Sequence, residues 1–108
     1  MIFISKFLIP KNYNGLAIYP FIFLKNKALT DNQILINHER IHLRQQIELL
    51  WVFFFLWYFL EFFIHLIKLR NWHKAYHSIS FEKEAYQNEN DIDYLKQRKF
   101  WAFLKFFN

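Results

Sequence analysis

The feature that most constrains the fold of this chain is an apolar run that starts at Leu49 and, with Glu61 as its first charged interruption, continues to Ile67. A helix formed by this run is apolar on every side, which excludes an ordinary surface helix, and it is about long enough to cross the hydrocarbon core of a bilayer. A basic and aromatic edge follows it, as expected at lipid headgroups: Lys68, Arg70 and Trp72. We therefore predict a membrane-associated helix over residues 47–69.

The composition also points to lipid. Aromatic residues make up 23% of the chain, with fifteen phenylalanines and four tryptophans, and the formal charge is +5. A chain of this length supports one domain, over residues 1–108, and a soluble domain of that size does not easily bury so many large rings. Nucleic acid also suits a basic aromatic surface, but the apolar fraction of 55% is too high and no nucleic-acid-binding module is present. We expect membrane lipid, and no nucleic acid, as a partner.

A metal-binding motif precedes the apolar run. Residues 38–42 read His-Glu-Arg-Ile-His. On a helix, positions i and i+4 share a face, so that His38 and His42 can direct two imidazoles at one metal ion. The carboxylate of Glu39 then lies beside the open position of the metal, where it can take a proton from bound water and later return it. This pattern is typical of zinc-dependent hydrolysis of peptide bonds.

The residues before the motif predict a helix. Thr30 is a good N-cap, and Gln33 stands three residues further on as its partner in a capping box. Asp31 lies in the first turn, where the helix dipole favours an anion. We therefore expect the motif helix to begin at Thr30.

A third metal ligand has to come from further along the chain, because there is no cysteine. The downstream candidates are His65, His73, His77, Glu82, Glu84 and Glu89. Glu82 fits best, since Ser80 can cap a helix whose first turn presents Glu82, and the small Ala85 lets a metal-bearing helix pack closely. We expect His38, His42 and Glu82 to bind the metal.

These residues resemble the gluzincin-type zinc metallopeptidases, in which an H-E-x-x-H helix is followed tens of residues later by a second helix carrying E-x-x-A-D or a close variant. Membrane-bound members include the CAAX-processing and BlaR-type sensor peptidases, and very small soluble members also exist. The resemblance covers roughly residues 16–90. It implies that His38, His42 and Glu82 bind Zn²⁺ and that Glu39 is the catalytic base.

The sequence departs from this family at Tyr86, which stands where the family has an aspartate that orients a zinc-bound histidine. Loss of such a carboxylate often lowers metal affinity or activity by about ten- to a hundredfold. The Tyr86 hydroxyl can instead donate a hydrogen bond to the oxyanion of the tetrahedral intermediate, which would make it a second catalytic residue. The alternative is that its ring only packs against a neighbouring helix.

A single straight span of the membrane conflicts with Glu82 as a ligand. A straight helix from His42 to Lys68 would be roughly 39 Å long, and the chain from Lys68 to Glu82 reaches about 46 Å only if it is fully extended. That return would also carry Arg70 and other polar residues through the lipid. We therefore expect a break near residues 46–50, although no glycine or proline stands there, and a helix that lies in the interface or enters it as a shallow hairpin.

Two polar residues, Glu61 and His65, interrupt the apolar run. They are four residues apart and therefore share a helical face. We expect an ion pair or hydrogen bond between them, with a second metal site or a proton-handling role as the alternative.

The two ends of the chain are expected to fold differently. A short strand or hairpin is predicted from Phe3 to Leu24, and by the family resemblance its Ile18–Leu24 part is the edge strand that binds extended substrate. The segment from Asp91 to Phe107 has aspartates at its start and cations toward its end, which suits a helix dipole. Its basic and aromatic residues suit a helix on an anionic bilayer surface.

Together these patterns predict an α+β, mostly helical fold. Its parts are a short N-terminal strand or hairpin, the motif helix, an apolar membrane-embedded helix, a Glu-bearing helix and a C-terminal interfacial helix. The expected function is that of a zinc-dependent metallopeptidase acting on a peptide or protein substrate at or near a membrane surface, at the cytoplasmic side of a bacterial inner membrane. The alternative is a catalytically inactive, gluzincin-like interaction protein attached to a membrane, which the missing aspartate and the small size favour.

Overall fold

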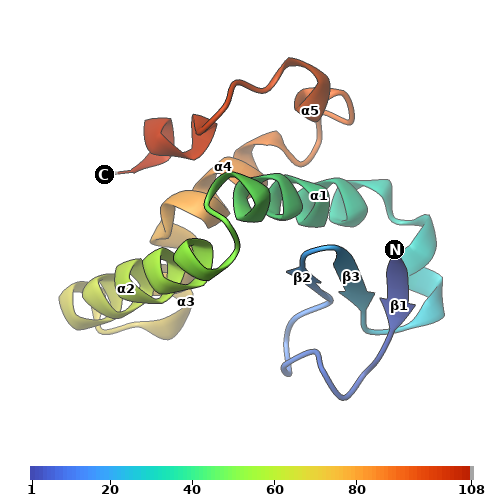
Figure 1. Cartoon of the computed structure of the whole chain (residues 1–108). Helices are drawn as coiled ribbons and strands as arrows, with labels where there is room; N and C mark the ends of the chain where they lie inside the picture. The colour runs from blue at the N-terminus through green and yellow to red at the C-terminus, as the bar shows by residue number, and fades with distance from the viewer. Residues whose placement is uncertain (108) are drawn as a thin grey trace.

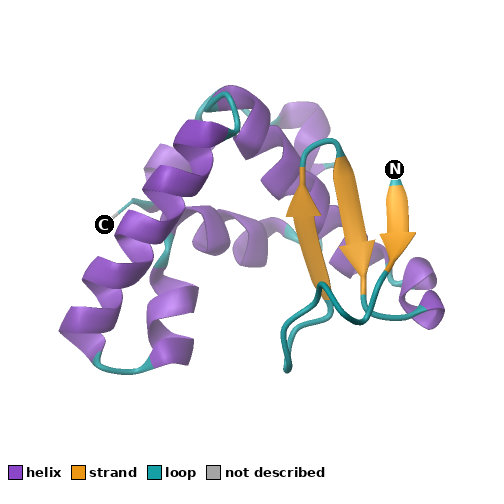
Figure 2. Cartoon of the chain, turned by 60° about the horizontal axis from the view of Figure 1, so that its bottom comes forward, coloured by secondary structure: helices purple, strands orange, loops and turns teal. Residues whose placement is uncertain are grey.

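A small three-stranded sheet forms the N-terminal part of the chain, and helices form most of the rest (Figure 1, Figure 2). The computed structural model describes residues 1–107. The elements in chain order are β1 (Ile2–Ile4), β2 (Gly15–Ile18), β3 (Phe21–Leu24), η1 (Lys27–Asp31), α1 (Gln33–Glu48), α2 (Val52–Leu69), α3 (Trp72–Ser78), α4 (Ser80–Asn88), α5 (Tyr94–Gln97) and η2 (Ala102–Phe106). The predicted α+β, mostly helical class is confirmed.

The sheet has β3 in its centre, with β1 parallel to it on one side and β2 antiparallel on the other. In this register Ile22 of β3 pairs with Ile2 and with Ala17. The expectation of an edge strand from Ile18 to Leu24 is therefore wrong, because most of these residues form the central strand. The free edge that faces α1 is β2, where the Gln46 side chain donates a hydrogen bond to the Ala17 carbonyl at 2.8 Å. Apolar patterning predicts strands but contains no information on their order in a sheet.

The motif helix α1 begins later than predicted. Its N-cap is Asn32, whose side chain accepts a hydrogen bond from the Leu35 N–H at 3.0 Å. Thr30 lies instead in the short 3-10 helix η1, where its hydroxyl donates to the carbonyl of Lys27. The difference agrees with intrinsic preferences, because asparagine is a better N-cap than threonine.

The predicted break between the motif helix and the apolar helix is confirmed. α1 ends at Glu48, and Leu50 and Trp51 have positive φ angles of 54° and 63° before α2 begins at Val52. Neither residue is a glycine, so each positive φ angle strains the backbone, at a cost of about 1–3 kcal/mol. Burial of Leu49, which is 6% exposed, in the core beneath the turn offsets part of that cost.

Helix α2 packs with one face and leaves the other uncovered. It pairs with α3 in a helical hairpin (Figure 1), and Phe54 and Phe62 on its inner face are buried in the main core. Exposed apolar side chains recur every three or four residues on the other face: Val52, Phe53, Leu56, Phe59, Leu60, Phe63, Ile64 and Ile67. Among residues 1–107, α2 is the one helix long and apolar enough to cross a membrane by length and composition.

Glu61 anchors α4 to the inner face of α2. Its carboxylate, 5% exposed, accepts hydrogen bonds from the backbone N–H of Ser80 at 2.9 Å and from the Ser80 hydroxyl. The carboxylate therefore caps α4, where the helix dipole favours an anion. Ser80 is the first residue of the helix and not its N-cap, which is Ile79. His65 Nε2 lies 3.9 Å from Glu61 Oε1, so the two side chains are neighbours as predicted, at a distance beyond that of a hydrogen bond.

The C-terminal segment is not the continuous helix that its charge order predicts. It forms only the short α5 and η2, with Arg98 in an extended conformation between them. The Arg98 side chain is fully buried and pairs with Glu48 of α1 and Glu84 of α4. Phe103 then packs against Phe81 in the core, with ring centroids 4.6 Å apart. These tertiary contacts outweigh the local preference for a helix.

Replacement of Arg98 by alanine tests this buried ion cluster. The substitution leaves two buried carboxylates without a cation, so we expect Arg98→Ala to lower the free energy of unfolding by about 3–5 kcal/mol. Chemical denaturation measures this value. Lys96→Ala is the control, because Lys96 is 82% exposed and its pairing with Asp93 contributes little. Equal stability of the two variants would contradict the assigned role.

Candidate metal centre

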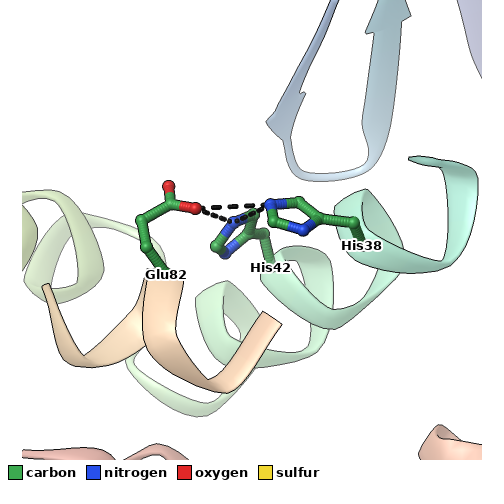
Figure 3. A group of neighbouring side chains, drawn as sticks. All are labelled: His38, His42 and Glu82. Atoms are coloured by element: carbon green, nitrogen blue, oxygen red, sulfur yellow. Dashed lines mark hydrogen bonds and ion pairs between the residues drawn. The ribbon is translucent and has the colours of Figure 1, made fainter. Parts of the chain in front are cut away.

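Two helices bring the three predicted metal ligands together (Figure 3). His38 and His42 project from one face of α1, and Glu82 projects from the first turn of α4. The two Nε2 atoms are 3.2 Å apart, and Glu82 Oε1 lies 3.3 Å from His38 Nε2 and 3.1 Å from His42 Nε2. All three side chains are buried. This group could hold a metal ion.

The hydrogen bonds behind the two imidazoles fix their tautomers. Gln45 Nε2 donates to Glu84 Oε1 at 2.9 Å, so its amide oxygen faces His42 and accepts from His42 Nδ1 at 2.8 Å. His38 Nδ1 likewise donates to Glu89 Oε1 at 2.8 Å. With both Nδ1 atoms protonated, each neutral ring presents the lone pair of its Nε2 atom to the centre.

When both rings are neutral, three lone pairs therefore converge, from the Nε2 atoms of His38 and His42 and from Glu82 Oε1. Such an arrangement is repulsive unless a cation occupies it. A tetrahedral metal with bonds of about 2.0–2.1 Å separates its donor atoms by about 3.3 Å. The observed separations of 3.1–3.3 Å match that spacing, so the residues fit a metal ion.

Without a metal, a proton serves as the cation. Burial alone lowers the pKa of His42, but Glu82, together with Glu39 and Gln45, outweighs burial and raises this pKa to about 9. Burial alone raises the pKa of Glu82, but His42 and His38 outweigh it and hold this pKa well below its ordinary value. The Glu82 carboxylate is therefore ionised and ready to bind a cation over the whole ordinary pH range.

Glu89 orients His38, a role that the sequence analysis assigned to no residue. It stands at the C-cap of α4, and its carboxylate accepts the His38 Nδ1 proton. In the gluzincin pattern this role belongs to an aspartate at the position of Tyr86, and here the carboxylate comes one helical turn later. Glu89 is seven residues after Glu82, about two helical turns, so the spacing contained the signal that both face α1.

Tyr58 is the second functional neighbour that sequence reasoning missed. Its hydroxyl donates a hydrogen bond to Glu82 Oε2 at 2.6 Å, which leaves Oε1 to face the histidines. The apolar helix α2 therefore contributes a polar group to the centre. No motif could indicate this, because the contact exists only once α2 folds back over α4.

Tyr86 lies beside the centre, and its observed contacts are those of a packed ring. It meets the His38 ring edge to face, with centroids 4.4 Å apart, and the His77 ring at 4.5 Å. Burial and the charge of Glu82 raise the pKa of its hydroxyl to about 12, so the hydroxyl keeps its proton. The other candidate ligands stay outside the three-residue group: His65, His73, His77, Glu84 and Glu89.

Glu39 stands between two cavities that flank the centre. One has a volume of about 240 Å³ and the other of about 390 Å³, and Tyr13, Gly15, Glu39 and Tyr76 line both. Gly15 lets β2 approach Glu39 closely, because a Cβ atom there would lie 2.9 Å from Glu39 Oε2. Burial raises the pKa of Glu39, against the opposing effect of His42 and His38.

Comparison of this chain with protein-family models, with curated proteins and with solved structures gives no match. The residues of the chain itself are therefore the basis for its proposed function. These provide three converging metal donors with a buried carboxylate and two cavities beside them.

Removal of the Glu89 carboxylate tests whether it orients a metal ligand. We expect Glu89→Ala to weaken metal binding by about ten- to a hundredfold, because the His38 ring loses the acceptor that fixes its tautomer. Competition against a chelating dye measures the affinity. Asp93→Ala removes an exposed carboxylate and should leave the affinity unchanged. A normal affinity in Glu89→Ala would refute this role.

The pH dependence of protein stability tests whether a proton on His42 stabilises the metal-free site. The pKa of His42 is raised from 6.5 to about 9, and that of Glu82 is lowered from 4.5. The contribution of this pair to the free energy of unfolding should therefore be complete between pH 4.5 and 6.5 and disappear as pH rises through about 9. Urea denaturation of metal-free protein from pH 5 to 10 measures it. The same fall in His42→Gln would show that another group is responsible.

Proposed function

We propose that this protein is a small zinc-dependent metallopeptidase, similar to the gluzincin-type enzymes, that hydrolyses peptide bonds at a membrane surface. The observation that carries this proposal is the position of Glu39. Its carboxylate lines both cavities beside the converging donors, so a group bound in either cavity comes within its reach. A general base must first of all lie within hydrogen-bond reach of the group whose proton it takes.

Zinc is the metal that the donor set favours. Two histidines and a glutamate are the ligands of one class of catalytic zinc site, in which the fourth position stays open. When bound, zinc would lower the pKa of a water molecule and polarise a peptide carbonyl. Glu89 behind His38 and Gln45 behind His42 are hydrogen-bond partners of the kind that orient zinc ligands.

Glu39 and Tyr86 are the proposed catalytic residues. The raised pKa of Glu39 suits a carboxylate that takes a proton from the attacking water and returns it to the leaving amine near neutral pH. Tyr86 lines the 240 Å³ cavity, and its protonated hydroxyl is the proposed donor to the oxyanion of the tetrahedral intermediate. Its ring packing on His38 would hold it in place for that role.

Peptide substrate is proposed to add to the edge of β2. The Ile22 N–H and the Leu24 carbonyl of β3 bond to β1. Their cross-strand partners, Ala17 and Gly15, therefore direct their own backbone groups away from β3. An extended peptide can pair with these outward groups by β-augmentation.

Gln46 limits how far such pairing extends. Its amide donates to the Ala17 carbonyl at 2.8 Å and accepts from the Tyr19 N–H at 2.6 Å, as a neighbouring strand would. The N–H and C=O of Gly15 and the N–H of Ala17 remain as the outward groups of β2 next to Glu39. A substrate strand would therefore be held at the part of β2 nearest the proposed base.

Helix α2 is proposed to lie in the membrane interface. Tyr58 and Glu61 tie its inner face to α4, so α2 cannot cross a bilayer without drawing the metal centre into the lipid. Its outer face exposes only apolar side chains between Val52 and Ile67. Lys68 at its end and the net charge of +5 suit anionic lipid, as on the cytoplasmic face of a bacterial inner membrane.

The second candidate is a catalytically inactive, gluzincin-like interaction protein attached to a membrane. The packing of the Tyr86 ring against the rings of His38 and His77 favours it, because these contacts account for Tyr86 without a catalytic role. The missing aspartate gives this candidate less support, because the Glu89 carboxylate supplies the hydrogen bond that the aspartate would make.

Substitution of the proposed base separates the two candidates. We expect Glu39→Gln to retain about one zinc per chain and to hydrolyse a pool of quenched fluorescent peptides about 10²- to 10⁴-fold more slowly, because the amide cannot accept the proton. Elemental analysis and fluorescence of detergent-purified protein give the two values.

The controls for this experiment are His38→Ala, His42→Ala and Glu82→Ala, each of which should lose the metal together with activity. Unchanged hydrolysis by Glu39→Gln would rule out its role as the base. A wild-type protein that binds zinc and cleaves no peptide, with a cellular role that Glu39→Gln preserves, would favour the interaction protein.

A further inference from the structure

The two cavities beside Glu39 differ in chemistry, and both lie along β2 and the residues that precede it. The polar cavity lies by the residues that lead into the strand, and its side chains include Asn12, Asn14, Asn32 and Glu89. The apolar cavity lies by the strand itself and is walled by rings of α2 and α3: Phe54, Phe55, Phe59, Phe62, Phe63 and Trp72. Glu39 and Gly15 line both cavities, so the change from polar to apolar occurs at the proposed base.

The direction of a bound peptide follows from the pairing that β2 offers. Antiparallel pairing is slightly more stable per residue than parallel pairing. An antiparallel peptide would have its N-terminal half beside Ala17 and the apolar cavity. Its C-terminal half would lie beside Asn14 and the polar cavity. The bond between the two halves would then lie next to Glu39.

We propose that the substrate is a peptide at a junction between an apolar and a polar segment, with the apolar residues on the N-terminal side of the bond that faces Glu39. This inference rests on the proposed peptidase function and names its substrate class. A membrane-anchored chain at the point where it leaves the bilayer has this chemistry, and so does a free peptide of the same pattern.

The apolar cavity is continuous with the uncovered face of α2. Phe59 and Phe63 line the cavity and are also 52% and 55% exposed on that face. The surface assigned to lipid and the wall of the cavity therefore share these rings. An apolar segment can pass from the bilayer into the cavity without crossing water, which would cost about 25 cal/mol for each Å² of apolar surface exposed.

Binding to zinc-loaded, full-length Glu39→Gln protein tests the inference without requiring turnover. The probes are two fluorescent ten-residue peptides of identical composition, one with leucine and phenylalanine before asparagine and serine, the other in the reverse order. Identical composition gives both peptides a similar partition into the detergent micelle. Fluorescence anisotropy should show the apolar-first peptide binding at least about tenfold more tightly, because the reversed peptide places large apolar side chains in the polar cavity.

A matched pair of substitutions on α2 separates the cavity from the membrane surface. Phe59 and Phe53 are 52% and 58% exposed on the same helix, but Phe53 lines neither cavity. Phe59→Lys should abolish the preference for the apolar-first peptide, whereas Phe53→Lys should preserve it. Both substitutions weaken lipid contact to a similar degree, so a change in lipid binding alone would affect both variants equally.

A second arm distinguishes the two sources of substrate. The apolar-first peptide is given an N-terminal acyl chain and offered in vesicles containing phosphatidylglycerol, beside the free peptide. Binding of either form supports the inference, and tighter binding of the acylated form identifies the membrane as the source.

Three results would overturn the inference: equal binding of the two peptides, tighter binding of the reversed one, or equal effects of Phe59→Lys and Phe53→Lys. Failure of the proposed function looks different. In that case the apolar-first peptide binds with the expected preference, but the wild-type protein cleaves neither peptide.

Discussion

The Nε2 atoms of His38 and His42 and one carboxylate oxygen of Glu82 face one point inside this protein, where a metal ion or a proton has to lie between them. Without a cation, electrostatic repulsion between these donor atoms would make the arrangement unfavourable. The arrangement extends outward through hydrogen bonds. His42 is held by Gln45, Gln45 by Glu84, and Glu84 by the buried Arg98 near the C-terminus. The last part of the chain therefore packs behind the metal centre and leaves the cavities open.

Helix α2 joins the candidate metal centre to the expected membrane surface. Its inner face supplies Tyr58 to Glu82 and Glu61 to the start of α4, while its outer face is apolar and uncovered. The break at Leu50 and Trp51 makes this possible, because it lets α2 turn away from α1 and still return α4 to the histidines. A straight continuation of α1 would have carried Glu82 away from the centre.

Several features were predictable because they depend on neighbours in sequence. Spacing along a helix placed His38, Glu39 and His42 on adjacent positions of one turn, and the need for a third ligand selected Glu82. The same constraint on distance predicted a break that no glycine or proline marks. Other features were missed or mistaken because they depend on distant partners. Local charge order predicted a C-terminal helix, but burial of Arg98 between two carboxylates outweighed it.

The sequence by itself determined which residues could provide the chemistry and which helix would be apolar, since periodicity, capping and side-chain type are local properties. Tertiary structure alone decided that β2 is the edge strand that faces α1 and that Glu89 and Tyr58 orient the candidate ligands. It also decided that a polar and an apolar cavity meet at Glu39. The physical reason is that strand order, hydrogen bonds between elements and cavities arise from packing between segments far apart in the chain, and no short sequence window contains both partners.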